Sequence, residues 1–431
     1  MRHKNKELTI KKLSGGFSKL TRKERHQRLL EMGVLTADDI EMLNEGKGLT
    51  PDLAERLVEN VIGCFQIPLG VAVNFNIDQQ DYVIPMATEE TSIIAAASKT
   101  AKWIREHGEI TTKTHGKLVI GQIQLPSIRD FEQVKEKIEV HKHTLINMAN
   151  QNVAQGLVTR GGGVKDIVVR HVARTDGGNM AVIHVMLDAC DAMGANITNQ
   201  VCEYLKNPIE SITSELVGMC ILSNLTDSKL TQAKVVIRNI DPAVGAAITE
   251  ASLFAEHDPY RAATNNKGVL NGIDAVLIAT GNDYRAVEAG IHAFAAHTGR
   301  YCSVTRWRME GADLIGLLEA PIVVGVVGGV TKLHPVAKLC LKMLNVSSAD
   351  QLSRIVAAVG LVQNLGAIRA LVTDGIVKGH MRLHTTNLAL AAGATEDELP
   401  LMKQELAEYL TTRKYISQND ATELLKKIRN K

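Results

Sequence analysis

The segment KDIVVRHVARTDGGNMAVIHVMLD (Lys165–Asp188) contains two apolar runs separated by a turn. The runs KDIVVRHV and AVIHVMLD are rich in β-branched residues, and Asp176-Gly177-Gly178 lies between them. Apolar runs bounded by Asp and Gly in this way are typical of paired strands. We therefore predict two neighbouring strands joined by a turn.

Further elements flank these two strands. LVIGQIQL (118–125) predicts a strand and Asp130–Gln151 a long helix on one side, and Gly194–Glu215 predicts a second helix on the other. Either MCILSN (219–224) or AKVVIRNI (233–240) supplies a fourth strand. The order β-α-β-β-α-β is the ferredoxin-like arrangement. We predict that it forms a compact module inserted between two parts of a larger domain.

The N-terminal part has helical signals. Thr21–Glu24 and Thr36–Asp39 both look like capping boxes. Thr50-Pro51 supplies a cap and a first-turn proline for a helix that we expect to run into ENVIG (59–63). TEETSIIAAASKTAKWI (88–104) predicts another helix.

The last part of the chain, from Asp374 onward, is amphipathic and predicts a small helical appendage. The fold class that follows is α+β, with a large, mainly helical domain, an inserted ferredoxin-like domain and a C-terminal helical flap. We place the large domain at residues 1–112 and 223–375, the inserted domain at 113–222 and the flap at 376–431.

Composition limits the classes of protein. The 431 residues are 45% hydrophobic and 22% charged, which is ordinary for a soluble globular protein. The net charge is +2 and aromatic residues make up 3%, which argues against a nucleic-acid partner. The basic runs at both ends are typical of solvated tails.

Cysteine usage and hydropathy indicate a cytoplasmic protein. None of the six cysteines forms a C-x-x-C pair, and neither they nor the 14 histidines have metal-ligand spacing, so we expect no metal. The longest apolar run, Ala320–Val330, is far shorter than the roughly 20 residues that span a membrane. No signal peptide is visible at the polar N-terminus.

Two polar clusters surround the apolar run AVLIAT (275–280). NNKG (265–268) precedes it and GND (281–283) follows it, which suggests a functional site on either side of a buried element. A lysine near a carboxylate in a poorly solvated pocket can donate a proton to a developing oxyanion. Lys267 is the lysine, and Asp274 and Asp283 are both eligible carboxylates.

Other motifs have a functional and a structural interpretation. Glu90 is a candidate acid or an ordinary acid at a helix start. DAMGAN (191–196) is a phosphate-binding turn or a plain strand-to-helix turn, and Gly161–Gly163 is a flexible turn or a place of close approach to a cofactor. His380, beside Gly379, is a catalytic acid on a mobile flap or a lone surface or core histidine. A Rossmann or P-loop fingerprint is missing.

Together these motifs resemble one known family. The chain is similar to the class II (soluble, bacterial and archaeal) 3-hydroxy-3-methylglutaryl-coenzyme A (HMG-CoA) reductases along nearly its whole length. The motifs that carry the resemblance occur in the family's order: ENVIG (59–63), EETSIIAAAS (89–98), DAMGAN (191–196), NKGVLNGI (266–273), ATGNDYRAVEAG (279–290) and GHM (379–381).

The resemblance implies a four-electron reduction. Two hydrides from a nicotinamide cofactor convert HMG-CoA into mevalonate and free coenzyme A, through mevaldyl-CoA and mevaldehyde, in the mevalonate pathway to isoprenoids. Lys267 matches the lysine that stabilises the oxyanion, and Glu90 the acid of the aldehyde step. Asp283 matches the carboxylate that links these two, and His380 the flap histidine that protonates the departing thiolate. Asp274 has no matching role and is expected to be structural.

The resemblance also implies contacts and partners. Family positions for substrate contacts are matched by Ser92, Arg261 and Asn271, and those for cofactor contacts by Asp191, Met193, Gly194 and Asn196. ENVIG matches a segment at the interface of a homodimer whose subunits complete each other's active sites. No nucleic acid or membrane partner is implied.

Cofactor choice follows from a departure from the NAD-using pattern, which has an aspartate before the triple glycine. Val140–Arg160 holds no carboxylate, while Lys142 and Arg160 lie in it, so NADP(H) is favoured and NAD(H) remains possible. Two alternatives stay open: the same enzyme acting as a CoA-acylating mevalonate dehydrogenase with NAD, and a non-catalytic CoA- or nucleotide-binding protein.

Overall fold

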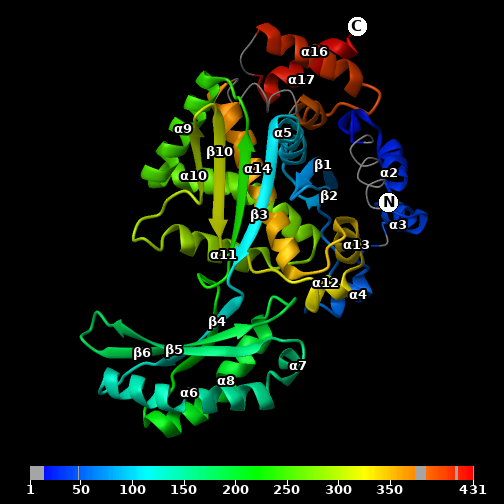
Figure 1. Ribbon diagram of the computed structural model, residues 1–431. Coiled ribbons are helices and arrows are strands. Elements are labelled where there is room, and N and C mark those ends of the chain that lie inside the picture. Colours follow the sequence, from blue (N-terminus) through cyan, green and yellow to red (C-terminus); the bar gives the residue numbers. More distant parts are fainter. Residues whose placement is uncertain (1–13, 47, 374–384, 413–415, 431) are drawn as a thin grey trace.

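Two separate β-sheets organise the chain, as Figure 1 shows. The structure is a computed structural model that describes residues 14–46, 48–373, 385–412 and 416–430. The chain leaves the larger sheet once, builds the smaller sheet and then returns, so the smaller unit is an insertion in the larger one.

The smaller sheet has the strand order β5-β6-β4-β7. Helices α6 (Phe131–Asn152) and α8 (Ala195–Thr213) cover one of its faces (Figure 1). This confirms the ferredoxin-like order of elements and identifies MCILS as the fourth strand. The strands are β4 (Leu118–Leu125), β5 (Gly163–Ala173), β6 (Asn179–Asp188) and β7 (Met219–Ser223).

The alternative fourth strand, in AKVVIRNI, belongs to the larger sheet instead. This six-stranded sheet has the order β2-β1-β3-β8-β10-β9, and only its β1–β3 pair is parallel. Its strands are β1 (Leu69–Ile77), β2 (Gln80–Ala87), β3 (Gly108–His115), β8 (Leu230–Ile237), β9 (Thr305–Glu310) and β10 (Asp313–Ala320).

Helices pack around α14 (Ala349–Val372) at the centre of the larger unit. Within the described residues, α14 is the one helix long and apolar enough to cross a membrane, with a mean hydropathy of 1.8 and 67% of that window buried. It is therefore a core helix. Around this unit lie α5 (Ile93–His107), α9 (Pro242–His257), α10 (Pro259–Ala279), α11 (Tyr284–Ala295), α12 (Gly329–Leu333) and α13 (Pro335–Leu344).

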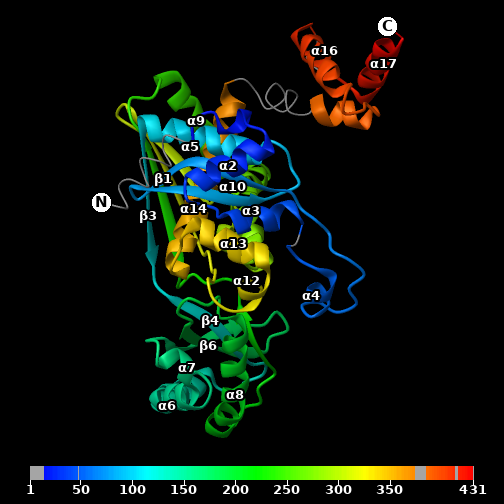
Figure 2. The same ribbon diagram turned by 90° about the vertical axis from the view of Figure 1, so that its right-hand side faces the viewer.

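Local signals near the N-terminus are only partly fulfilled. Both capping boxes form, at the starts of α2 (Arg22–Glu31) and α3 (Ala37–Asn44). The helix that begins at Pro51 was predicted to reach ENVIG, and this is wrong, because α4 ends at Glu55. Val58 and Ile62, which follow α4, are exposed, so little packing stabilises further helical turns there. Figure 2 shows this part of the chain reaching away from the sheets.

The C-terminal part forms its own helical cluster. Residues 385–391, α16 (Leu399–Thr412) and α17 (Gln418–Arg429) are helical, and Met402, Leu406 and Leu424 lie in their shared core. Figures 1 and 2 place this cluster at the end of the molecule opposite the smaller sheet. His380 lies in segment 374–384, outside the described residues.

Candidate active site

The NNKG and GND clusters lie on the two sides of a buried helical segment. Asp258 caps α10 by accepting a hydrogen bond from the Arg261 amide at 2.9 Å, and Pro259 occupies the first turn. Lys267 lies inside the helix, and its apolar C-terminal half is buried. Asp283 lies beyond the end of α10, as the N-cap of α11. Because a helix rises 1.5 Å per residue, about 18 Å of helix separates Lys267 from Ala279.

Lys267 meets Glu90 across 177 positions of sequence. The Lys267 ammonium donates to the Glu90 carboxylate, with 2.9 Å between Nζ and Oε2. Glu90 lies in the bend between β2 and α5, and α5 begins only at Ile93. Glu90 therefore faces a lysine rather than the amides of a helix start. This position does not fit an acid that stabilises a helix start.

The ion pair is open to solvent in the single chain. The Lys267 side chain is 61% exposed and the Glu90 side chain 39% exposed. We expected a poorly solvated pocket, and the isolated chain does not provide one. Exposed ion pairs of this kind contribute little to stability. The pair is therefore a candidate for proton transfer rather than a stabilising contact. A poorly solvated site at this pair would need further atoms that cover it.

Two further predicted substrate contacts lie on the same helix as Lys267. At 100° per residue, Arg261, Lys267 and Asn271 fall within an arc of about 120° on α10. Burial lowers the pKa of the Arg261 guanidinium from its usual value. A half-buried guanidinium on the same helix as Lys267 is suited to bind a carboxylate in a bidentate manner.

Ser92 is held in an unusual conformation beside Glu90. Its φ is 81°, in the left-handed region that residues with a side chain rarely adopt. Ser92 is the N-cap residue of α5 but its side chain makes no capping bond, and its buried Oγ has no hydrogen-bond partner in the described structure. A buried hydroxyl without a partner calls for an explanation, and a substrate contact would supply one.

Asp283 does not reach Lys267 or Glu90 within one chain. Its Oδ1 accepts a hydrogen bond from the Ala286 amide at 3.1 Å and lies 3.6 Å from Arg285 Nε. The link that we expected from Asp283 to the Lys267–Glu90 pair is not formed inside the described chain, because α10 separates the two clusters.

The DAMGAN turn connects β6 to α8. Gly194 is the N-cap residue of α8 with φ 91°, a conformation that favours glycine, and no side chain caps the helix. Free amides at the start of a helix bind anions such as phosphate. The turn therefore fits the diphosphate of a dinucleotide. Met193 is half-buried beside it, and Asn196 is exposed.

Asp191 holds this turn against the larger unit. Its Oδ1 accepts from the Ala349 amide at the start of α14 at 2.9 Å, and its carbonyl oxygen accepts from Val326 at 3.0 Å. The adjoining Gly325 amide donates to Asn282 Oδ1 at 2.8 Å. The predicted cofactor turn and the GND cluster are thus joined through Gly325.

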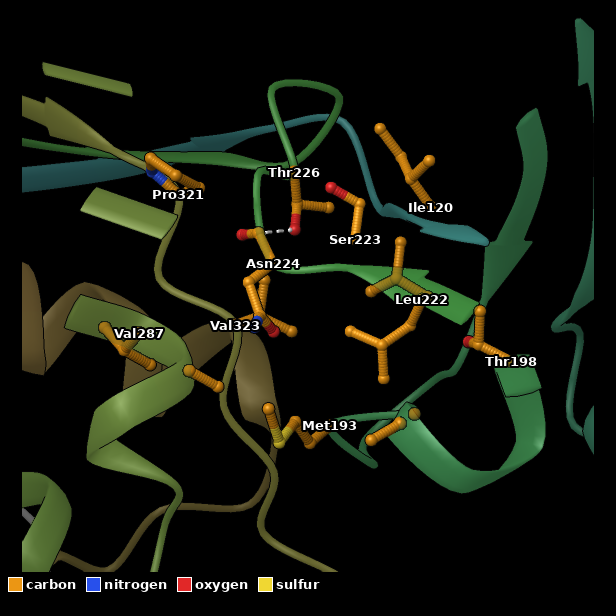
Figure 3. Close-up of a pocket in the computed structure, with 14 residues that line it drawn as sticks. Ile120, Met193, Thr198, Leu222, Ser223, Asn224, Thr226, Val287, Pro321 and Val323 are labelled. Atoms are coloured by element: carbon orange, nitrogen blue, oxygen red, sulfur yellow. Dashed lines mark hydrogen bonds between the residues drawn. The ribbon is translucent and has the colours of Figure 1, made fainter. Parts of the chain in front are cut away.

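A cavity lies between this turn and α11 (Figure 3). Sequence reasoning missed Asn224 and Thr198, which line it; the polar pair Ser223-Asn224 at the end of β7 was the available signal. Thr198 is 2% exposed, and its Oγ1 has no hydrogen-bond partner in the described structure. The lining residues are Val119, Ile120, Met193, Gly194, Ala195, Thr198, Leu222, Ser223, Asn224, Thr226, Ala286, Val287, Pro321 and Val323.

The stretch before the triple glycine offers less positive charge to a ligand than its sequence indicates. Lys142 Nζ lies 2.6 Å from the Asp166 carboxylate, which raises the pKa of this lysine and neutralises its charge locally. Asp166 is on β5, outside the stretch that we searched for acids. Arg160 is exposed, so it is the cation of this stretch that remains available to a ligand.

Metal-ligand groups are not found in the part of the chain that the structure describes. No group of three or more His, Cys, Asp or Glu residues there could hold a metal ion. The polar chemistry of the candidate site thus consists of an ammonium, carboxylates, a guanidinium, hydroxyls and amides.

The fold thus combines an inserted ferredoxin-like unit, which carries an uncapped helix start, with a larger unit that carries a lysine–carboxylate pair. The profile described as "Hydroxymethylglutaryl-coenzyme A reductase" matches residues 21–385. The chain belongs to this family and to its class II.

Similar proteins span almost the full chain. A 3-hydroxy-3-methylglutaryl-coenzyme A reductase from Archaeoglobus fulgidus is 44% identical over 420 residues, with 96% of this chain and 94% of that protein covered. A probable reductase of the same name from Borreliella burgdorferi is 31% identical over 431 residues, covering 96% of each chain.

Solved structures agree. The reductase from Streptococcus pneumoniae is 36% identical with a TM-score of 0.82, and the match covers 96% of this chain and 99% of that one. A class II structure from the same organism, described as bound to NADPH in open conformations, has a TM-score of 0.81 at 36% identity and covers 83% and 99%.

Proposed function

We propose that this chain is an HMG-CoA reductase that converts HMG-CoA into mevalonate and free coenzyme A. The observation that carries the proposal is the contact between Lys267 and Glu90, formed by segments 177 residues apart. A cation on α10 and an acid in the bend between β2 and α5, held in direct contact, suit the reduction of a carbonyl group. Membership of the family supplies the substrate class.

Two reduced nicotinamide cofactors, bound one after the other, would each supply one hydride. In the first step the thioester carbonyl becomes an oxyanion, and the Lys267 ammonium stabilises it. The oxyanion then collapses with loss of the coenzyme A thiolate, which His380 protonates in our proposal. In the second step the aldehyde oxygen takes up a proton as the carbon accepts the second hydride, and Glu90 is the proposed source of that proton.

We propose that Asp283 enters the site from a second copy of the chain. About 18 Å of α10 separates Lys267 from the end of its own helix, which is too far for Asp283 of the same copy to contact it. The cofactor turn is joined to the Asp283 side of α10, through Gly325 and Asn282. A site completed by two copies also explains why the Lys267–Glu90 pair is open to solvent in one chain.

Exposed apolar side chains support this homodimer. Val58, Ile62 and Phe65, in and beside ENVIG, are exposed on the segment that reaches away from the sheets (Figure 2). Val330 and Leu333 of α12 are also exposed. Clusters of exposed apolar side chains mark interaction surfaces, and a second copy of this chain would cover them.

We propose NADPH as the preferred cofactor. Support comes from Arg160, an exposed cation near the triple glycine, and from the lack of a carboxylate in Val140–Arg160. The neutralised Lys142 weakens this preference, so NADH remains usable. Steady-state rates with the two cofactors, measured in both directions, test this proposal and the physiological direction. A strong preference for NADH would overturn it.

We assign the cofactor to residues 113–222, the substrate and dimer contacts to 1–112 and 223–375, and the closing flap to 376–431. Support for the division comes from the chain passing between the two sheets after β3, which ends at His115, and again after β7, which ends at Ser223; each assigned boundary falls just inside one of these strands. A cytoplasmic location is also proposed, because the six cysteines are free thiols and Cys202 and Cys340 are buried.

The decisive test compares two lysines in similar surroundings. Lys267 and Lys102 are 61% and 62% exposed, and each pairs with a glutamate. Lys267→Ala should reduce turnover of HMG-CoA by at least about a hundredfold while HMG-CoA binding partly survives. Lys102→Ala should retain near-normal turnover. Near-normal turnover of Lys267→Ala would refute the proposed oxyanion role.

A further inference from the structure

Two asparagines precede Lys267 in the interior of α10. Asn265 is 2% exposed and Asn266 is fully buried. Asparagine is a poor residue for a helix interior, and a buried amide destabilises the fold unless its donors and acceptor are all used. Such residues need a reason to be present, and the hydrogen bonds of the two amides indicate one.

Asn266 is bound to a single connecting segment, residues 301–304. Its Nδ2 donates to the Tyr301 hydroxyl at 3.0 Å and to the Cys302 carbonyl at 2.9 Å, and its Oδ1 accepts from the Val304 amide at 3.1 Å. The Tyr301 hydroxyl also lies 2.7 Å from His292 Nδ1 on α11. Because Tyr301 accepts from Asn266, its own proton is free to go to His292.

Asn265 binds the same segment and also reaches β9 and α14. Its Nδ2 donates to Ser303 Oγ at 2.7 Å and to Thr305 Oγ1 at 3.1 Å, and its Oδ1 accepts from Asn364 Nδ2 at 2.9 Å. Asn364, on α14, in turn accepts from the buried Trp307 Nε1 at 2.8 Å. This network connects α10 to β9 and to the central helix.

The two anchors fix the orientation of α10 next to the candidate site. They point in directions about 100° apart, so together they resist both rotation and sliding of this turn. Lys267 Nζ can lie about 8 Å from the helix axis, and a rotation of about 10° would move it by about 1.4 Å. A misplacement of about 1 Å can reduce a reaction rate a hundredfold.

We propose that Asn265 and Asn266 are positioning residues for Lys267. Their buried amides hold the turn of α10 that carries the ammonium, so that it faces Glu90 and the reacting oxygen. This inference rests on the proposed function, because it gives Lys267 a catalytic role. It explains why NNKG contains two buried asparagines, which apolar side chains could replace if only packing mattered.

The experiment compares Asn266→Ala with Val269→Ala. Val269 is fully buried on the same helix, three residues on, and makes apolar contacts only. Both substitutions leave a cavity and should lower the thermal midpoint. Turnover is divided by the number of HMG-CoA-binding sites measured by titration calorimetry. Unfolded protein, which does not bind HMG-CoA, then does not affect the comparison. Asn266→Ala should lower kcat at least tenfold with KM for HMG-CoA within threefold, whereas Val269→Ala should keep kcat within twofold.

A milder variant covers the case in which Asn266→Ala does not fold. Tyr301→Phe removes one hydrogen-bond acceptor of Asn266 and keeps the ring, and it should lower kcat several-fold without a matching rise in KM. Equal kcat per binding site in the asparagine or tyrosine variant and in Val269→Ala would overturn the proposal. Lys267→Ala, measured in parallel, separates failure of the positioning proposal from failure of the proposed function. If Lys267→Ala keeps turnover, the proposed function itself fails.

Discussion

Replacing Asp274 by asparagine should stabilise the protein at alkaline pH. Asp274 lies on α10 and faces Glu288 of α11. Burial, followed by the charge of Glu288 and a hydrogen bond with it, raises the pKa of Asp274 to about 8. One of its oxygens, Oδ1, is buried and makes no hydrogen bond in the described structure. Near neutral pH this carboxyl group is therefore protonated in the folded protein.

The sign of the pH dependence follows from the two pKa values. An unfolded aspartate has a pKa of 3.8, so between about pH 4 and pH 8 the folded state binds more protons than the unfolded state. The stability from this proton is complete below the unfolded pKa and is lost as pH rises towards the folded one. The free energy of unfolding then falls by at most about 1.4 kcal/mol for each pH unit.

Asp274→Asn keeps the shape and removes the titration. Because Asp274 is only partly buried and shares its proton with Glu288, we expect a gain of about 2 kcal/mol at pH 8 over the parent, far below the limit set by the full shift. The gain should be small at pH 5. The assay is the thermal midpoint at pH 5, 6.5 and 8. Because the unfolding entropy scales with chain length, about 2 kcal/mol corresponds to a rise of about 2 °C for 431 residues.

Glu106→Gln is the control for a change of surface charge, because Glu106 is 54% exposed in a surface ion pair. Its thermal midpoint should follow the parent at every pH. If Asp274→Asn instead lost stability equally at all three pH values, Asp274 would be ionised in the native protein, and the reasoning would be refuted.

Three further predictions concern the cofactor and the flap. Gly325→Ala would place a Cβ 2.7 Å from the Met193 amide, so the proposed cofactor turn must shift; we expect a higher KM for NADPH and a loss of about 1–3 kcal/mol in stability, both measured on the purified protein. Arg160→Glu should lower kcat/KM for NADPH at least tenfold and spare NADH, whereas Lys135→Glu on α6 should change neither. His380→Gln should impair reduction of the thioester far more than reduction of added mevaldehyde; equal losses would count against a role as thiolate acid.

Local patterns were sufficient for some parts of this fold. The strands of Lys165–Asp188 and the two capping boxes form as predicted, because β-branched runs bounded by turn residues and side-chain caps both act through neighbouring residues. The helix from Pro51 failed because its extension would have needed packing that the chain does not provide.

Contacts between residues far apart in the sequence could not be predicted from local patterns. β3 pairs with β8 over residues 108–115 and 230–237, with the whole smaller sheet in between. Lys142 lies in a stretch without acids, yet Asp166 reaches it from the next strand. In the candidate site, the resemblance alone brought Lys267 and Glu90 together, and it did not identify Thr198 or Asn224.

The length of α10 has a consequence for mixed assemblies. If Lys267 of one copy works with Asp283 of the other, a Lys267→Ala chain and an Asp283→Ala chain are each inactive alone. A heterodimer of the two would contain one site without either group and one complete site. Random pairing of equal amounts would then restore about one quarter of the normal activity. Recovery of activity on mixing the two inactive variants would thus show that the two groups of one site lie on different copies of the chain, on opposite sides of α10.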